Sequence, residues 1–72
     1  MPSLPVVSGQ DVTDALQRLG FDKVRQKGSH VVMQRGSVGC VVPLHREVKK
    51  GTLATIIRQA GLTQDEFAAA LK

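Results

Sequence analysis

Aromatic side chains are almost absent from this sequence of 72 residues, which has two phenylalanines, Phe21 and Phe67, and no tyrosine or tryptophan. Many proteins that bind single-stranded RNA stack nucleobases on aromatic rings, and two rings are too few for such a platform. The core must therefore be built from Val, Leu, Ile and Ala. Any contact with a nucleic acid must rely on charge and shape.

Cysteine is also scarce, because Cys40 is the single one in the chain. No intramolecular disulfide can form, and one Cys with two His cannot supply the four ligands of a zinc site. We therefore expect no metal and no other cofactor. Cys40 lies in an apolar run, so we expect it to pack as a small hydrophobic residue rather than to act as a nucleophile.

Long apolar runs are missing as well, so no segment is expected to cross a membrane. The amino terminus lacks the basic region and apolar stretch of a signal peptide, which predicts a cytoplasmic protein. A chain of 72 residues has room for one small core, and we expect a single domain over residues 1–72.

Acidic side chains are rare in the middle of the chain. The whole sequence has a net charge of +4, but residues 23–58 contain eight Lys or Arg and only one acidic residue, Glu47. A solvated charged surface would normally mix both signs, so this distribution favours a surface that binds phosphate groups.

A first helix is predicted after Ser8, because Ser8 and Asp11 have the spacing of a capping box. Apolar residues then recur at helical spacing: Val12, Ala15, Leu16 and Leu19. Gly20 can adopt the left-handed conformation that ends a helix, and Phe21 can then fold back on Leu16.

Three antiparallel strands are expected next. Residues 22–27 alternate so that Lys23, Arg25 and Lys27 would share one basic face. Gly28-Ser29 predicts a tight turn into a second strand over residues 30–35. A turn over residues 36–39 should lead to a third strand, Cys40-Val41-Val42, which Pro43 should end or place at an edge.

Two helices complete the prediction. Thr52 is a plausible N-cap for a helix whose apolar face would contain Leu53, Ile56, Ile57 and Ala60, and Gly61 should close it. Thr63 and Glu66 form a capping box for a short last helix, whose Phe67 should dock on the preceding helix or on a partner. The fold class is therefore α+β, a helix, a three-stranded antiparallel sheet, a helix and a short C-terminal helix.

Histidines are the best candidates for proton transfer, since imidazole titrates near neutral pH and the chain has only His30 and His45. Ser29 is a poor nucleophile for His30 to activate, because neighbouring strand residues face opposite ways. RNA supplies its own nucleophile, the 2′-hydroxyl, and needs only an acid, a base and cations. The candidate RNA-binding residues are Lys23, Arg25, Lys27, Ser29, Arg35, Arg46, Lys49 and Lys50.

An ordered set of short motifs spans nearly the whole chain: Ser8-Gly9, Leu19-Gly20-Phe21, Lys27-Gly28-Ser29-His30, Pro43-Leu44-His45 and Lys50-Gly51-Thr52-Leu53. With Arg25, Ile56 and Ala60-Gly61, this set resembles the HicA (YcfA-like) toxins of HicAB toxin–antitoxin systems.

The resemblance implies a fold similar to the double-stranded-RNA-binding domain and an endoribonuclease (mRNA interferase) that blocks translation. It implies that His30 is catalytic, that His45 is a secondary candidate, and that a HicB-type antitoxin binds the toxin in a hetero-oligomer. Two alternatives remain open at this point, a non-catalytic module for double-stranded RNA and a protein-interaction domain with a basic face.

Overall fold

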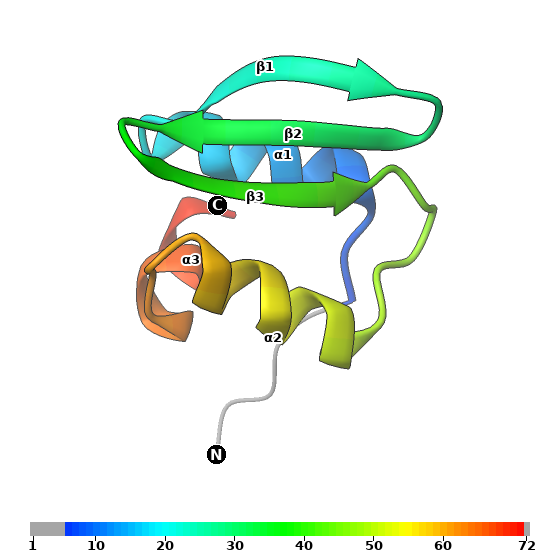
Figure 1. The fold of residues 1–72 in the computed structure, drawn as a ribbon. Coiled ribbons are helices and arrows are strands. Elements are labelled where there is room, and N and C mark those ends of the chain that lie inside the picture. The colour runs from blue at the N-terminus through cyan, green and yellow to red at the C-terminus, as the bar shows by residue number, and fades with distance from the viewer. Residues whose placement is uncertain (1–5, 72) are drawn as a thin grey trace.

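The structure is a computed structural model that describes residues 6–71. Its elements follow the expected order (Figure 1): α1 (Gly9–Arg18), β1 (Asp22–Lys27), β2 (His30–Arg35), β3 (Val38–Pro43), α2 (Lys50–Gln59) and α3 (Gln64–Ala70). The α+β class and the helix–sheet–helix–helix order are thus confirmed. The amino-terminal segment that we judged not to be a signal peptide lies largely outside the described residues.

The sheet has the order β1-β2-β3, with both strand pairs antiparallel, so β2 is central. Each hairpin has a two-residue Gly-Ser turn, and both glycines have positive φ, +59° at Gly28 and +61° at Gly36. The second turn is shorter than predicted, because Val38 and Gly39 already pair with Arg35 and Gln34. β3 lies at an edge and ends at Pro43, as expected for a residue that has no N–H to donate.

The predicted alternation of β1 is wrong at one point. Lys23 pairs with Met33 and Arg25 pairs with Val32, so Val24 is an extra residue in a bulge. A bulge reverses the alternation of faces, and Lys23 therefore lies on the face of the buried Met33. Arg25 lies on the opposite face, which is turned away from the helices. The bulge divides the cations that we expected on one face.

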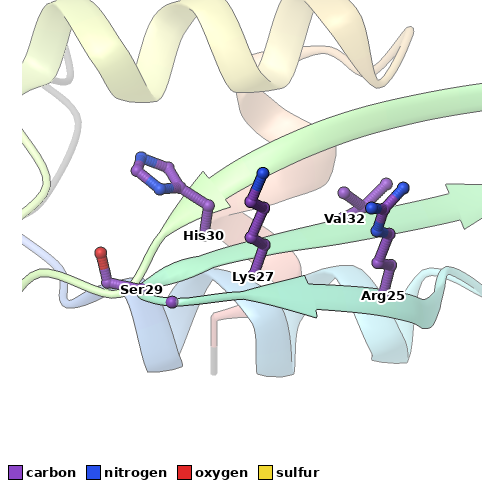
Figure 2. A pocket seen from close by; sticks show the side chains of 6 residues that line it. Arg25, Lys27, Ser29, His30 and Val32 are labelled. Atoms are coloured by element: carbon purple, nitrogen blue, oxygen red, sulfur yellow. The ribbon is translucent and has the colours of Figure 1, made fainter.

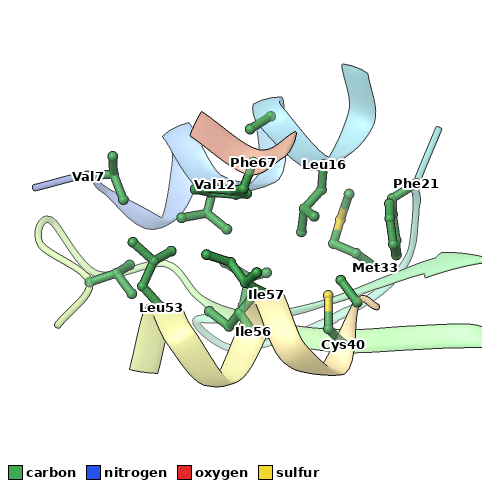
Figure 3. Packing of buried hydrophobic residues seen from close by; sticks show 14 of the residues in the cluster. Val7, Val12, Leu16, Phe21, Met33, Cys40, Leu53, Ile56, Ile57 and Phe67 are labelled. Atoms are coloured by element: carbon green, nitrogen blue, oxygen red, sulfur yellow. The ribbon is translucent and has the colours of Figure 1, made fainter. Parts of the chain in front are cut away.

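The core fills the space between the sheet and the helices (Figure 3). It is aliphatic apart from Phe21 and Phe67, which are both fully buried. Cys40 is buried among these side chains, as predicted, and burial raises the pKa of its thiol. Phe67 anchors α3, which packs against both α1 and α2, so this ring is part of the core and not free for a partner.

The helix ends follow the sequence signals at most positions. Ser8 and Thr63 each form the predicted capping box, and Gly20 and Gly61 adopt positive φ. The predicted cap at Thr52 is wrong, because α2 begins at Lys50 with Lys49 as N-cap. A backbone bridge between Val7 and Val48 fixes the chain just before Lys49, and the helix starts there. Within the described residues, no helix has the length and apolar character required to span a membrane.

Candidate functional site

An open pocket lies at the β1–β2 hairpin. Its strand residues are on the sheet face opposite the buried Val31 and Met33. It is lined by Arg25, Lys27, Gly28, Ser29, His30 and Val32. Figure 2 shows the side chains of Arg25, Lys27, His30 and Val32 extending from the same side of this hairpin. The hairpin therefore presents an imidazole, two cations and an apolar wall together.

Strand register explains why these side chains meet. His30 is the first residue of the central strand and pairs with Lys27 on one side and with Pro43 on the other. Val32, two residues along β2, pairs with Arg25. Paired residues share a face, and so do residues two apart in a strand. Arg25 and Lys27 therefore share the face of His30, and the bulge before Arg25 puts Lys23 on the other face.

The turn places His30 at the rim of the sheet. Gly28 takes the left-handed conformation at the first turn position while Ser29 keeps a negative φ, a combination that favours glycine at the first site. The carbonyl of Ser29 accepts a hydrogen bond of 2.6 Å from the Leu44 N–H. His30 is exposed, so a substrate can reach its imidazole.

The two pocket cations, Arg25 and Lys27, differ from Arg18 and Arg35, whose guanidinium groups are bonded to backbone carbonyls. Arg18 donates to the Ala70 carbonyl at 2.7 Å, and Arg35 donates to the Leu19 carbonyl, also at 2.7 Å. Within residues 6–71, no hydrogen bond holds the exposed side chains of Arg25 and Lys27. Their charges remain available for an anionic ligand, and a guanidinium can bind a phosphate with two N–H groups.

The pocket contains no carboxylate. In the described part of the chain, no cluster of three or more His, Cys, Asp or Glu side chains could hold a metal ion. The chemistry that the lining residues themselves can supply is proton transfer by His30 and stabilisation of negative charge by Arg25 and Lys27.

The remaining candidates lie outside the pocket. His45, Arg46, Lys49 and Lys50 are exposed on the connection from β3 to the start of α2. The connection begins beside the Gly28-Ser29 turn, but none of these four side chains lines the pocket. Arg35 is at the other end of β2, over the Phe21 ring at 4.8 Å from its centre. Lys23 faces the other side of the sheet.

Val32 is the pocket residue that our sequence reasoning did not single out. Its position two residues after His30 in an alternating strand was a sufficient signal, since both side chains must share a face. Val41 pairs with Val32 on this same face and is 45% exposed. An apolar strip therefore borders the basic pocket.

Comparison with known families identifies the class of protein that has this fold and site. A family model described as HicA toxin of bacterial toxin-antitoxin matches residues 9–62, which is most of the chain. The protein therefore belongs to the HicA toxin family and is the toxin of a toxin–antitoxin system, with an antitoxin as its partner. A comparison with curated proteins gave no match.

Proposed function

We propose that this toxin is a metal-independent endoribonuclease that cleaves messenger RNA and thereby blocks translation, with His30 as its general acid or base. The observation that carries the proposal is the pocket itself, in which the exposed imidazole of His30 lies with Arg25 and Lys27, two cations that no hydrogen bond holds within residues 6–71. Membership of the HicA family supports the same reading.

The reaction that suits these residues uses the 2′-hydroxyl of RNA as the nucleophile. A base removes its proton, the 2′-oxygen bonds to the adjacent phosphorus, and the bond to the 5′-oxygen breaks as an acid protonates that oxygen. The products are a 2′,3′-cyclic phosphate and a 5′-hydroxyl end. His30 performs one of these proton transfers, while Arg25 and Lys27 stabilise the charge that builds on the phosphoryl oxygens.

The surface beyond the pocket would hold the flanking RNA. Arg46, Lys49 and Lys50 follow the β3 end that pairs with His30, so they are suited to contact neighbouring phosphates. His45 lies in the same connection and is our secondary candidate for a proton transfer. We leave Lys23 and Arg35 out of this surface, because one faces the other side of the sheet and the other is bonded to Leu19.

The partner that fits a HicA toxin is a HicB-type antitoxin, and we propose that the two form a hetero-oligomer. The site on this chain is open and cationic, so a bound antitoxin must neutralise or cover those charges to prevent RNA from entering.

The decisive experiment compares the wild-type toxin, free of antitoxin, with His30→Ala on RNA in the presence of EDTA. We expect the wild type to cleave and the variant to be slower by about 100-fold or more, since general acid–base catalysis contributes about 10²–10⁴. RNA binding should persist in the variant, because its cations are intact. Equal cleavage by the two proteins would refute the role of His30.

A non-catalytic module for double-stranded RNA is the second candidate, favoured by the fold and by the exposed cations Arg25 and Lys27 on an open sheet face. It predicts salt-dependent binding by both proteins and cleavage by neither. The same experiment therefore separates the two functions.

A further inference from the structure

A short backbone segment, Pro43-Leu44-His45, lies between the Gly28-Ser29 turn and the start of α1. On one side, the Leu44 N–H donates a hydrogen bond of 2.6 Å to the Ser29 carbonyl. On the other side, the Gly9 N–H donates one of 2.8 Å to the His45 carbonyl. The segment thus connects the first residue of α1 to the turn that leads into His30.

Glycine is the one residue type that fits at position 9. A Cβ built on Gly9 would overlap the Pro43 carbonyl oxygen and lie 2.6 Å from the Leu44 Cα. Both neighbours are backbone, so they could not rotate away as a flexible side chain would. Gly9 does not have a positive φ, and the requirement for glycine is therefore one of space alone.

The Gly28-Ser29 turn has few other contacts. A Cβ at Gly28 would meet nothing within 4 Å, and both turn residues are exposed. Apart from the strand pairs at its base, its carbonyl groups accept two hydrogen bonds, one from Leu44 and one of 3.2 Å from the exposed Gln26 side chain. The Leu44 bond is the contact that ties the turn to the packed part of the molecule.

α1, which begins at Gly9, is held firmly in the fold. Its start is fixed by the Ser8–Asp11 capping box, and its inner face, with Val12, Ala15 and Leu16, is buried in the core. We therefore expect a Cβ at Gly9 to displace the Pro43-Leu44 backbone, and with it the Gly28-Ser29 turn, rather than the helix.

We propose that Gly9 and the Leu44 amide are positioning groups that hold the His30 imidazole in register with Arg25 and Lys27. This inference rests on the proposed ribonuclease function. A catalytic group that moves by about 1 Å can cost about 100-fold in rate, so the contact should act on kcat. KM should change less than kcat, because exposed cations bind phosphate groups through long side chains that can follow a small shift of the backbone, whereas proton transfer needs an exact position.

The test removes one N–H group by chemical synthesis. The Gly39-Cys40 junction allows residues 1–39, as a thioester, to be ligated to residues 40–72 carrying an ester in place of the Leu44 amide. This change leaves every side chain intact. We expect kcat to fall about tenfold or more and KM to stay within about twofold, because the turn loses its bond to the segment.

The control is an ester in place of the Val48 amide, whose N–H donates to the Val7 carbonyl at 2.7 Å. It removes the same kind of bond from the same connection, away from the turn. Both esters should lower the thermal unfolding midpoint, and only the Leu44 ester should lower kcat. Kinetics are measured at a temperature where circular dichroism finds all proteins folded.

A second pair of variants tests Gly9. Gly9→Ala should reproduce the kcat loss of the Leu44 ester, whereas Gly51→Ala should leave kcat unchanged, because a Cβ at Gly51 meets nothing within 4 Å. If Gly9→Ala does not fold, the ester pair still decides the question.

The outcomes separate this inference from the function on which it rests. An active wild type and inactive His30→Ala, with full kcat in the Leu44 ester, would overturn the positioning role alone. Equal kcat losses in the Leu44 and Val48 esters would also overturn it, because they would indicate general loosening. A wild type that does not cleave RNA would overturn both proposals.

Discussion

The two hairpin turns of the sheet have the same sequence and nearly the same φ at their glycines, yet the two ends of the sheet differ in what surrounds them. Gly28-Ser29 and Gly36-Ser37 are both two-residue turns with glycine at positive φ in the first position. Gly28-Ser29 leads into His30, whereas Gly36-Ser37 leads into the partly buried Val38, which packs against the core. The Gly-Ser sequence therefore forms both hairpins, but it does not determine which of them has a function.

The arginines show what distinguishes the two ends. Arg35, beside the second turn, donates to the Leu19 carbonyl at 2.7 Å and lies 4.8 Å from the centre of the Phe21 ring. Its charge stabilises the end of α1 and the adjoining core. Arg25 has no such partner among the described residues and lines an open pocket. An arginine supports folding or ligand binding according to what its guanidinium already contacts.

The largest effect is expected when the two pocket cations are replaced. Arg25→Gln combined with Lys27→Gln should lower kcat/KM for RNA by about 10- to 100-fold and weaken its salt dependence, because two phosphate contacts are lost. The urea midpoint of unfolding should barely change, since both side chains are exposed.

Arg35→Gln is the matched control and should behave in the opposite way. We expect it to cost about 1–2 kcal/mol of unfolding free energy, from a charged hydrogen bond and a cation–π contact. Cleavage should be normal at temperatures where the variant is folded. A loss of RNA cleavage without a loss of stability would contradict the division between the two ends.

The glycines of the two turns offer a finer comparison. Gly28→Ala and Gly36→Ala should each destabilise the protein by about 1 kcal/mol, because the left-handed conformation strains a residue with a Cβ. Only Gly28→Ala should lower the cleavage rate, since its turn carries His30. Urea titrations and initial rates for the two variants check both statements, and equal activity would show that cleavage tolerates a strained turn.

The smallest effect concerns pH at the Arg35 end. A hydrogen bond from the Thr63 N–H lowers the pKa of the exposed Glu66, helped by the Thr63 hydroxyl and the charge of Arg35. A carboxyl with a lowered folded-state pKa stabilises the fold above its usual value of 4.5, and the stabilisation is lost as pH falls through the folded pKa.

Wild type should therefore be slightly more stable than Glu66→Gln at neutral pH and equal to it in acid. Gln keeps an acceptor for the Thr63 N–H, so the comparison isolates the charge. Chemical denaturation between pH 7 and pH 2 measures it, and a stability difference that does not change with pH would exclude this role of the carboxylate.

Local signals predicted most of the helix boundaries because each depends on residues close in the chain. The Ser8–Asp11 and Thr63–Glu66 boxes form as expected. Gly20 and Gly61 are followed by the expected return hydrogen bonds, from Phe21 to Leu16 at 2.9 Å and from Leu62 to Ile57 at 3.1 Å. The failure at Thr52 has a different origin, the non-local bridge of Val7 with Val48.

The site was predictable in part for the same reason. His30, Ser29 and Lys27 are neighbours in the chain, so the turn alone brings them together. The separation of Lys23 from Arg25 was not predictable, because the bulge is a property of the pairing between β1 and β2 and leaves the sequence pattern of β1 unchanged.

Residue types and spacing by themselves determined most helix ends, the hairpins and the aliphatic core, and they made His30 one of two candidate imidazoles, of which the family resemblance favoured His30. Tertiary structure alone decided that Lys23 is separated from the cations beside His30, which arginines are bonded to the fold, and why Gly9 must lack a side chain. The physical reason is the separation along the chain over which each effect acts. Propensity, capping and alternation act within a few residues, whereas a bulge, a guanidinium partner or a close backbone approach depends on segments that meet only after folding.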